Sequence, residues 1–219
     1  MNKAVVLLSG GLDSTTLLYF VKSRKYAVHC LIFDYGQRHK KEILMAQKIA
    51  REAGAAFDVV KIQMPWRGSA LLDKKVKIPE RKIIDSKEIP VTYVPARNII
   101  FLSFAVSCAE AIGAKAVFIG ANALDYSGYP DCRPDFFEAY TRVITTGTKA
   151  GVEGGSIKIQ TPLIHKTKSQ IIKMGLKLGV PYELTWSCYK GGSKPCGGCD
   201  SCQLRAKGFA EAGSIDPSL

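Results

Sequence analysis

The sequence lacks several patterns that would place it in large classes of proteins. No run of eighteen apolar residues occurs, so we expect no membrane-spanning helix and no membrane partner. Neither a Gly-x-Gly-x-x-Gly dinucleotide fingerprint nor a Gly-Lys-Ser/Thr phosphate loop is present, which argues against a nicotinamide-dependent enzyme and against a Walker A nucleotidase. Only three histidines occur in 219 residues, so candidates for a general base are few.

Acidic residues are also scarce, and this bears on the partners. Lysine and arginine number 31 against 19 acidic residues, a net charge of +12 that favours anionic ligands such as nucleotides, with RNA as an alternative. The basic residues form short scattered groups rather than one long run interleaved with aromatics. We therefore expect a solvated lysine-rich surface and no stable complex with nucleic acid.

The N-terminus and the cysteines indicate the compartment. A strand is predicted to begin within three residues of the start, which leaves no room for a signal peptide. Seven cysteines are an odd number, and four of them fall within fifteen residues, which favours metal binding in a reducing compartment over disulfides. We therefore expect a cytoplasmic protein with an α/β domain over residues 1–184 and a small metal-binding segment, 185–219, packed on it.

Apolar strands alternate with amphipathic helices along most of the chain. Strands are predicted over 3–8, 27–33, 57–61, 116–120 and 157–160, and helices over 14–25, 41–53, 99–112, 135–146 and 167–178. This order predicts an α/β fold with a doubly wound, mainly parallel five-stranded sheet. Residues 63–93 interrupt the pattern, and we interpret them as a lid or rim over a site at the carboxyl edge of the sheet, where ligands of such folds bind.

The first strand leads into the stretch Ser9-Gly-Gly-Leu-Asp-Ser-Thr-Thr16 and then into a helix. Gly10 and Gly11 let the backbone turn its N–H groups toward an anion, and the start of the helix adds its positive dipole end. The hydroxyl groups can hold phosphate oxygens. A carboxylate at Asp13 beside phosphates implies a cation such as Mg²⁺ between them. An ordinary helix-capping turn is the alternative.

The tail carries four cysteines, Cys188, Cys196, Cys199 and Cys202, in the pattern Cys-x7-Cys-x2-Cys-x2-Cys. Four thiolates spaced in this way predict a closed, tetrahedral and therefore structural Zn²⁺ site. An iron–sulfur cluster is the competing interpretation.

The loop over residues 120–136 is rich in groups that recognise ligands. Tyr126 and Tyr129 are placed to sandwich a planar heterocycle, Asp131 to accept hydrogen bonds from its edge, and Arg133 to hold a carboxylate. A surface turn rich in Asn, Asp and Gly is the alternative.

Together these motifs resemble the PP-loop ATP pyrophosphatase superfamily and, within it, the 7-cyano-7-deazaguanine synthase family. The resemblance covers residues 3 to about 209 and rests on six segments: Ser9-Gly-Gly-x-Asp-Ser14, Asp34-Tyr-Gly-Gln-Arg-His39, Val94-Pro-x-Arg-Asn98, Asp125-Tyr-Ser-Gly-Tyr-Pro-Asp-Cys-Arg-Pro134, Thr161-Pro-Leu163 and Cys196-Gly-x-Cys-Asp-Ser-Cys202. Ala96 departs from the pattern, because that family often has glycine there.

The resemblance implies a ligase that converts 7-carboxy-7-deazaguanine and ammonia to the nitrile through adenylated intermediates. It implies ATP, Mg²⁺ and structural zinc as cofactors, ammonia from solution or from a partner, and a homodimer. Acid, amide and nitrile share one carbon oxidation level, so no redox cofactor is required.

The resemblance also implies roles for individual residues. Those acting in catalysis are Ser9, Asp13, Ser14 and Arg97. Those binding the nucleotide are Leu8, Ser9, Gly10, Gly11, Leu12, Asp13, Ser14, Thr15, Thr16, Phe33, Tyr35 and Arg38. Those binding the deazapurine are Arg97, Asn98, Asp125, Tyr129, Asp131 and Arg133.

Two other functions are compatible with part of the sequence. A PP-loop enzyme that modifies tRNA, such as a thiolase, would use the same loop, a cysteine site and the positive charge. A zinc-ribbon protein that binds nucleic acid would explain the tail and the charge, but it leaves the first 180 residues without a role.

Overall fold

A computed structural model describes residues 1–219 except 39, 67, 80–88, 125–127 and 219. At its centre is a five-stranded sheet in the order β3-β2-β1-β4-β5, and every neighbouring pair of strands is parallel. The strands are β1 (Lys3–Leu7), β2 (Ala27–Asp34), β3 (Ala56–Lys61), β4 (Ala116–Phe118) and β5 (Lys158–Gln160). The predicted fold class is thus confirmed.

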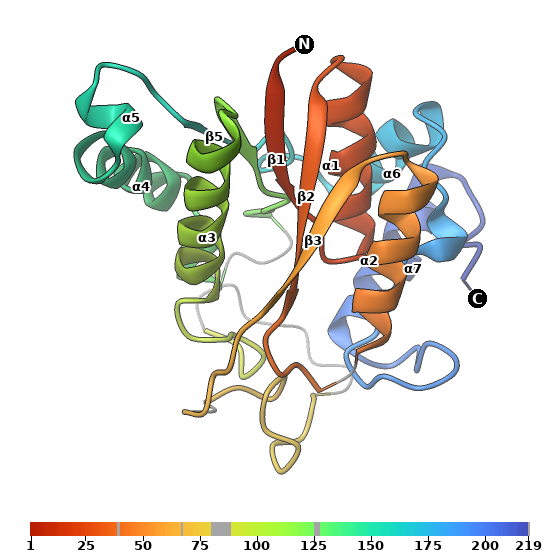
Figure 1. The fold of residues 1–219 in the computed structure, drawn as a ribbon. Coiled ribbons are helices and arrows are strands. Elements are labelled where there is room, and N and C mark those ends of the chain that lie inside the picture. The colour runs from red at the N-terminus through yellow and green to blue at the C-terminus, as the bar shows by residue number, and fades with distance from the viewer. Residues whose placement is uncertain (39, 67, 80–88, 125–127, 219) are drawn as a thin grey trace.

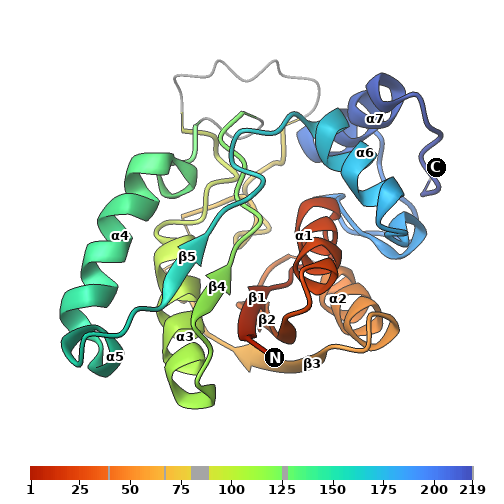
Figure 2. The ribbon, with the colours of Figure 1, turned by 90° about the horizontal axis from the view of Figure 1, so that it is seen from above.

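Helices cover both faces of the sheet (Figures 1 and 2). One face carries α1 (Leu12–Ser23), α2 (Lys41–Glu52), α6 (Lys168–Lys177) and α7 (Asp200–Ala212); the other carries α3 (Arg97–Ile112), α4 (Pro134–Gly147) and the short α5 (Lys149–Val152). Short 3-10 turns lie at η1 (Pro130–Cys132) and η2 (Tyr182–Leu184). The central strand supplies both cores, because Ala4 and Val6 point into one and Val5 and Leu7 into the other. Its continuous apolar sequence therefore reflects burial on both faces.

The C-terminal segment differs from the sequence-based expectation. Residues 185–219 were predicted as a small metal-binding segment and the last predicted helix ended at residue 178, but α7 runs over Asp200–Ala212 and ends at Gly213, whose φ of 71° suits a helix C-cap. Phe209 belongs to the same apolar cluster as Tyr182, with the two rings edge-to-face at 5.4 Å. At Gly208 an added Cβ would lie 2.3 Å from the side chain of Lys168, so α7 packs closely on α6. Lys168 and Gly208 are 40 residues apart in the sequence, so no local sequence pattern predicts this contact.

Ala96 adopts the left-handed conformation, with φ 54° and ψ 23°, at the N-cap of α3. Glycine takes this conformation without steric cost, whereas alanine is strained by about 1–2 kcal/mol. The departure noted in the sequence therefore falls on a position where the backbone favours glycine.

A buried ion pair ties the end of the chain to the body of the protein. Arg205 on α7 donates from Nε and Nη2 to the two carboxylate oxygens of Asp216, at 2.8 and 2.9 Å. Its guanidinium also donates to the Tyr182 carbonyl and to the Thr185 hydroxyl. Both charged side chains are less than a tenth exposed.

Removing one partner of this pair should destabilise the protein strongly. Asp216→Ala leaves the Arg205 charge buried without its carboxylate, and we expect a loss of about 3–5 kcal/mol in the free energy of unfolding, measured by chemical denaturation. The double variant Arg205→Met with Asp216→Ala should recover part of this loss, since no charge then remains buried. A loss of less than about 1 kcal/mol in the single variant would show that the pair contributes little.

No helix in the described part of the chain is long and apolar enough to cross a bilayer.

Candidate active site

A cavity of about 240 Å³ opens at the carboxyl edge of the sheet, where β1, β2 and β4 end and α1, α2, α3 and α6 begin. It is lined by residues from both halves of the chain. The predicted site residues among them are Leu8, Ser9, Gly11, Leu12, Asp13, Ser14, Phe33, Tyr35, Arg38, Arg97, Asn98 and Tyr129.

The loop between β1 and α1 holds a compact set of hydroxyl groups. The Ser9 and Ser14 hydroxyls share a hydrogen bond of 3.0 Å, and Ser14 Oγ also accepts from the Ser9 backbone N–H. Gly11 is the N-cap of α1, and no described side chain caps the helix start. The first backbone N–H groups of α1 and two serine hydroxyls therefore face the cavity as a site for an anion.

Gly10 fixes the loop against its neighbours. Its φ is 81°, and its carbonyl accepts from the Trp186 backbone N–H at 2.9 Å. An added Cβ would lie 2.4 Å from the Glu42 carbonyl oxygen and 2.8 Å from the Ala46 backbone nitrogen, so α2 leaves no room for a side chain. Gly10 thus acts as a structural part of the loop and does not line the cavity.

Gly10→Ala should displace the loop and weaken the binding of the ATP that the resemblance implies, on the order of a hundredfold, as misplacement by about 1 Å does at other sites. The matched control is Gly113→Ala, because Gly113 has a similar φ of 71° but nothing lies within 4 Å of its added Cβ. Both variants place alanine at a positive φ and so strain the backbone, but only Gly10→Ala also makes the new Cβ clash with α2. Equal dissociation constants for ATP by calorimetry in the two variants would contradict the packing argument.

Asp13 lies at the start of α1 and pairs with Lys168 at the start of α6. The Lys168 ammonium donates to both carboxylate oxygens at 2.8 Å, although 155 residues separate the two positions. Lys168 is almost fully buried, and Asp13 remains about one-fifth exposed toward the cavity. Sequence reasoning missed Lys168. The only signal was its place at the start of the helix predicted over 167–178, where a cation opposes the helix dipole.

A second polar group lies where β2 ends and α2 begins. Gln37 accepts from the Tyr35 backbone N–H at 2.8 Å and donates to the Phe33 carbonyl and to Glu42, each at 3.0 Å. Two backbone groups of the predicted nucleotide-binding residues, the Tyr35 N–H and the Phe33 carbonyl, are therefore bonded to Gln37. The Phe33 ring stacks on Phe101 at 4.0 Å and forms an apolar wall of the cavity.

The charges of this region are set by burial. Burial raises the pKa of Glu42 to about 7, although Gln37 and Arg97 favour its ionised form. Burial also opposes the charge of Arg97, but the surrounding polar groups, Tyr35 and Tyr129 first among them, hold its pKa above the usual range. The cavity thus contains a permanent cation and a carboxyl group that titrates near neutrality.

The start of α3 organises the loop that follows β4. The Asn98 backbone N–H donates to the Asp131 carboxylate at 3.0 Å, and the Asn98 side chain donates to the Asp131 carbonyl at 2.9 Å and to Cys132 Sγ at 3.3 Å. The Tyr129 hydroxyl shares a hydrogen bond with Thr92. Burial raises the pKa of the Cys132 thiol to about 11, so it faces the cavity as a neutral group.

Several predicted residues do not line the cavity. The Thr15 and Thr16 hydroxyls donate to the Gly11 and Leu12 carbonyls and are fully buried. Arg133 is exposed, and Asp131 is buried with its carboxylate bonded to the Asn98 backbone N–H.

Arg38 does line the cavity, but its guanidinium is already bonded within the protein. It donates to the carbonyls of Asp73, Lys74 and Val76 and holds that turn in place. Asp125 and Tyr126 fall outside the described residues.

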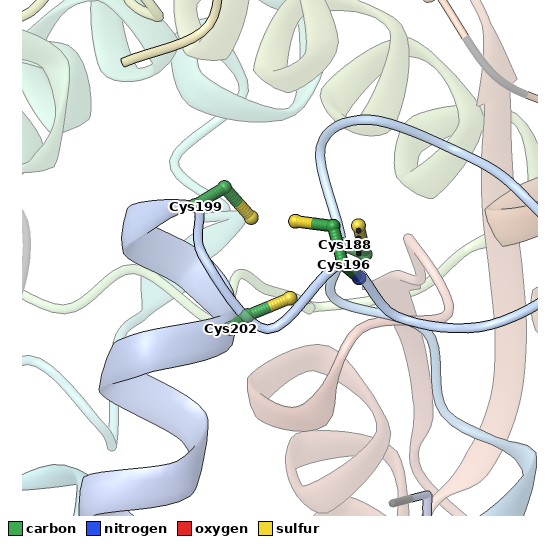
Figure 3. Close-up of side chains that lie close together, drawn as sticks. All are labelled: Cys188, Cys196, Cys199 and Cys202. Atoms are coloured by element: carbon green, nitrogen blue, oxygen red, sulfur yellow. Dashed lines mark hydrogen bonds between the residues drawn. The ribbon is translucent and has the colours of Figure 1, made fainter. Parts of the chain in front are cut away.

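The four tail cysteines converge (Figure 3). Their sulfur atoms all lie within 4.8 Å of one another, and no other such cluster of metal-ligating side chains occurs among the described residues. Cys199 caps α7 and Cys202 lies in its first turn, so both point toward Cys188 on the preceding loop. Hydrogen bonds from Cys199 and Cys202 lower the pKa of Cys188. Zinc–sulfur bonds of about 2.3 Å place tetrahedral sulfurs about 3.8 Å apart, so a small closure of this cluster fits the metal.

The cysteine cluster is coupled to the cavity. Trp186 donates from Nε1 to the Cys188 carbonyl at 3.0 Å, and the Lys41 ammonium lies 3.7 Å above the Trp186 ring. Lys41 also donates to the Ser193 carbonyl. Ala70 and Ile78, from the segment that we predicted to be a lid, pack in the same apolar cluster as the cysteines. Trp186, Ser187, Tyr189 and Ser201 then form one side of the cavity.

Comparisons with known proteins agree on one family. A family model described as queuosine biosynthesis protein QueC matches residues 3–213. The chain is 55% identical over 217 residues to a 7-cyano-7-deazaguanine synthase of Thermoplasma acidophilum, covering 99% of this chain and 91% of that protein. It is 56% identical over 220 residues to one of Clostridium kluyveri, covering 99% and 97%. Among solved structures it is similar to NMN synthetase of Francisella tularensis, with a TM-score of 0.52 and 15% identity over 98% of this chain and 78% of that one, a likeness of fold.

Proposed function

This chain belongs to the QueC family, and from that premise we propose that it converts 7-carboxy-7-deazaguanine, ammonia and ATP to 7-cyano-7-deazaguanine. The observation that carries the proposal is the loop from Ser9 to Ser14, which opens an anion site onto a cavity that also contains Arg97 and a deep apolar wall. The proposed substrate is a planar heterocycle with a carboxylate, which ATP activates; the anion site suits the phosphates, and Arg97 and the apolar wall suit the substrate.

The loop acts on the leaving group. A carboxylate oxygen of the substrate attacks the α-phosphorus of ATP, and the bond to the β-phosphate oxygen breaks with its electron pair. The Ser9 and Ser14 hydroxyls and the N–H groups at the start of α1 accept the pyrophosphate that forms. Lys168 adds a positive charge on the same side of the cavity.

Magnesium fits the donor set at Asp13, since carboxylate and phosphate oxygens are the ligands it prefers. It would neutralise the developing charge on pyrophosphate. In the structure both Asp13 oxygens contact Lys168, so the lysine supplies positive charge at this position and holds the carboxylate in place.

Arg97 and the loop after β4 form the opposite side. Arg97 lies in the cavity with its charge maintained, which suits the substrate carboxylate or the α-phosphate. Asn98 and Asp131 bond to each other, so we assign them to holding Cys132 and Tyr129 at the cavity wall. Tyr129 then contributes a face for the heterocycle.

We further propose a homodimer in the cytoplasm, with structural zinc on the four tail cysteines. The exposed side chains of Ile99 and Phe104 lie on α3, a helix that is apolar nearly all round. Such a helix is normally covered, which supports a contact between two copies.

An isotope experiment tests the reaction directly. The protein receives ATP, Mg²⁺, an ammonium salt and 7-carboxy-7-deazaguanine labelled with ¹⁸O in the carboxylate, and products are measured by mass spectrometry. We expect nitrile, pyrophosphate and AMP that carries the label. Formation of ADP with the label in inorganic phosphate would show that ATP phosphorylates the carboxylate and does not adenylate it. Turnover that occurs only with tRNA would point to a tRNA-modifying enzyme.

A further inference from the structure

Glu42 lies at the second residue of α2, against the nucleotide loop. Its backbone carbonyl is the atom that excludes a side chain at Gly10, so the start of α2 and the loop touch. Its side chain lines the cavity together with Ser9, Ser14 and Arg97. Its carboxyl group is bonded to Gln37, another residue of the cavity lining, so Glu42 lies beside the space where we expect the activated substrate.

The two carboxyl oxygens of Glu42 have different surroundings. Gln37 donates to Oε1 at 3.0 Å, and Gln37 is itself fixed by the backbone at Tyr35 and Phe33. Within the described part of the chain no donor contacts Oε2. Gln37 thus holds Glu42 through one oxygen, and no described donor satisfies the other.

The reaction requires a proton acceptor three times. Ammonia attacks the acyl adenylate, the bond to AMP breaks with its electron pair, and nitrogen loses one proton to give the amide. The amide oxygen then attacks a second ATP, pyrophosphate leaves, and nitrogen loses another proton. Finally the carbon–oxygen bond to AMP breaks, the remaining N–H electron pair completes the nitrile, and the last proton departs.

We propose that Glu42 is the general base that accepts these protons from the substrate nitrogen. This inference rests on the proposed function and goes beyond it by assigning a catalytic residue. No histidine lines the cavity among the described residues, and the Cys132 thiol is neutral. The other acidic side chain that lines it, Asp13, is occupied by Lys168. Glu42 is the carboxylate with a free oxygen.

The charges around Glu42 fit this role. Arg97 on α3 and the Tyr35 phenol, just after β2, interact with it electrostatically. The Asp13–Lys168 pair, Arg38 and Arg205 line the same cavity. Because the pKa of Glu42 is raised to about 7, the group is a stronger base than an ordinary carboxylate; about half of it is ionised at neutral pH and most of it above.

The amide form of the substrate gives the sharpest test, because its conversion to nitrile needs ATP but no ammonia. The pH dependence of its conversion rate therefore does not include the protonation of ammonia to ammonium. We expect nitrile formation by the unmutated protein to fall tenfold per pH unit below about 7, where Glu42 is protonated, and to be level above it. Glu42→Gln keeps the acceptor for Gln37 but removes the base, so it should lose on the order of a hundredfold or more in rate and also the inflection. Glu42→Asp should keep the inflection at a lower rate.

Exchange of labelled pyrophosphate into ATP, with the carboxylate substrate and no ammonia, separates this role from ATP binding. Glu42→Gln should retain this exchange within about threefold, and Glu52→Gln, at the exposed end of the same helix, should match the unmutated protein in both assays. Equal loss of exchange and of nitrile formation in Glu42→Gln would overturn the proposal, as would full nitrile formation. Absence of both activities in the unmutated protein would instead refute the proposed function.

Discussion

Asp13→Asn should lower the rate of AMP release on the order of a hundredfold to a thousandfold. Asparagine keeps the size of the side chain but removes the charge that pairs with Lys168 and that suits a divalent cation. The rate should be followed as AMP formed from ATP and the carboxylate substrate at saturating Mg²⁺.

Lys168→Met should have a comparable effect, because the lysine is the partner of Asp13 and a cation facing the same cavity. If the two residues act as a unit, the double variant should be little slower than either single variant. Asp58→Asn is the control, since Asp58 is exposed on β3 and pairs only with His29 among the described residues. Retention of activity within tenfold in Asp13→Asn would remove Asp13 from the proposed mechanism.

Loss of the cysteine site should lower stability strongly. Cys199→Ser should release the zinc that we propose there, and we expect the melting temperature to fall by about 10 °C. Metal-binding free energy of several kcal/mol is also folding free energy, and each kcal/mol corresponds to about 2–4 °C in a chain of this size. Elemental analysis should give one zinc per chain in the unmutated protein and none in the variant.

Activity should be lost together with the metal, because the cysteine loops carry Trp186 and Tyr189 into the cavity wall. Cys108→Ser is the matched control, since this partly buried cysteine lies on α3, outside the cluster. Normal melting temperature and metal content in Cys199→Ser would show that the cluster is not a metal site. Iron and sulfide in the purified protein would establish the competing cluster.

The regular elements were predictable because their signals are local. The five strands and five of the helices follow from the period of apolar residues and from capping residues, as at Thr167, whose side chain forms a capping box with Gln170. The helix α7 was missed because the loop that leads into it, residues 188–199, is rich in glycine and cysteine and gives no helical apolar period. It is stabilised by distant partners, with Phe209 packed on Tyr182 and Arg205 paired with Asp216.

The sequence by itself determined the parallel sheet, the phosphate loop and the cysteine set, since each depends on neighbouring residues in one segment. Only the tertiary structure decided which polar groups remain available to a ligand. In the fold, the side chains of Thr15, Thr16 and Arg38 donate to backbone carbonyls, and Lys168 pairs with Asp13 although 155 residues separate them. It also places Glu42 in the cavity with one open oxygen. The residue type determines which hydrogen bonds and ion pairs a side chain can form. Packing determines which of these form within the protein and which groups remain free to bind a ligand.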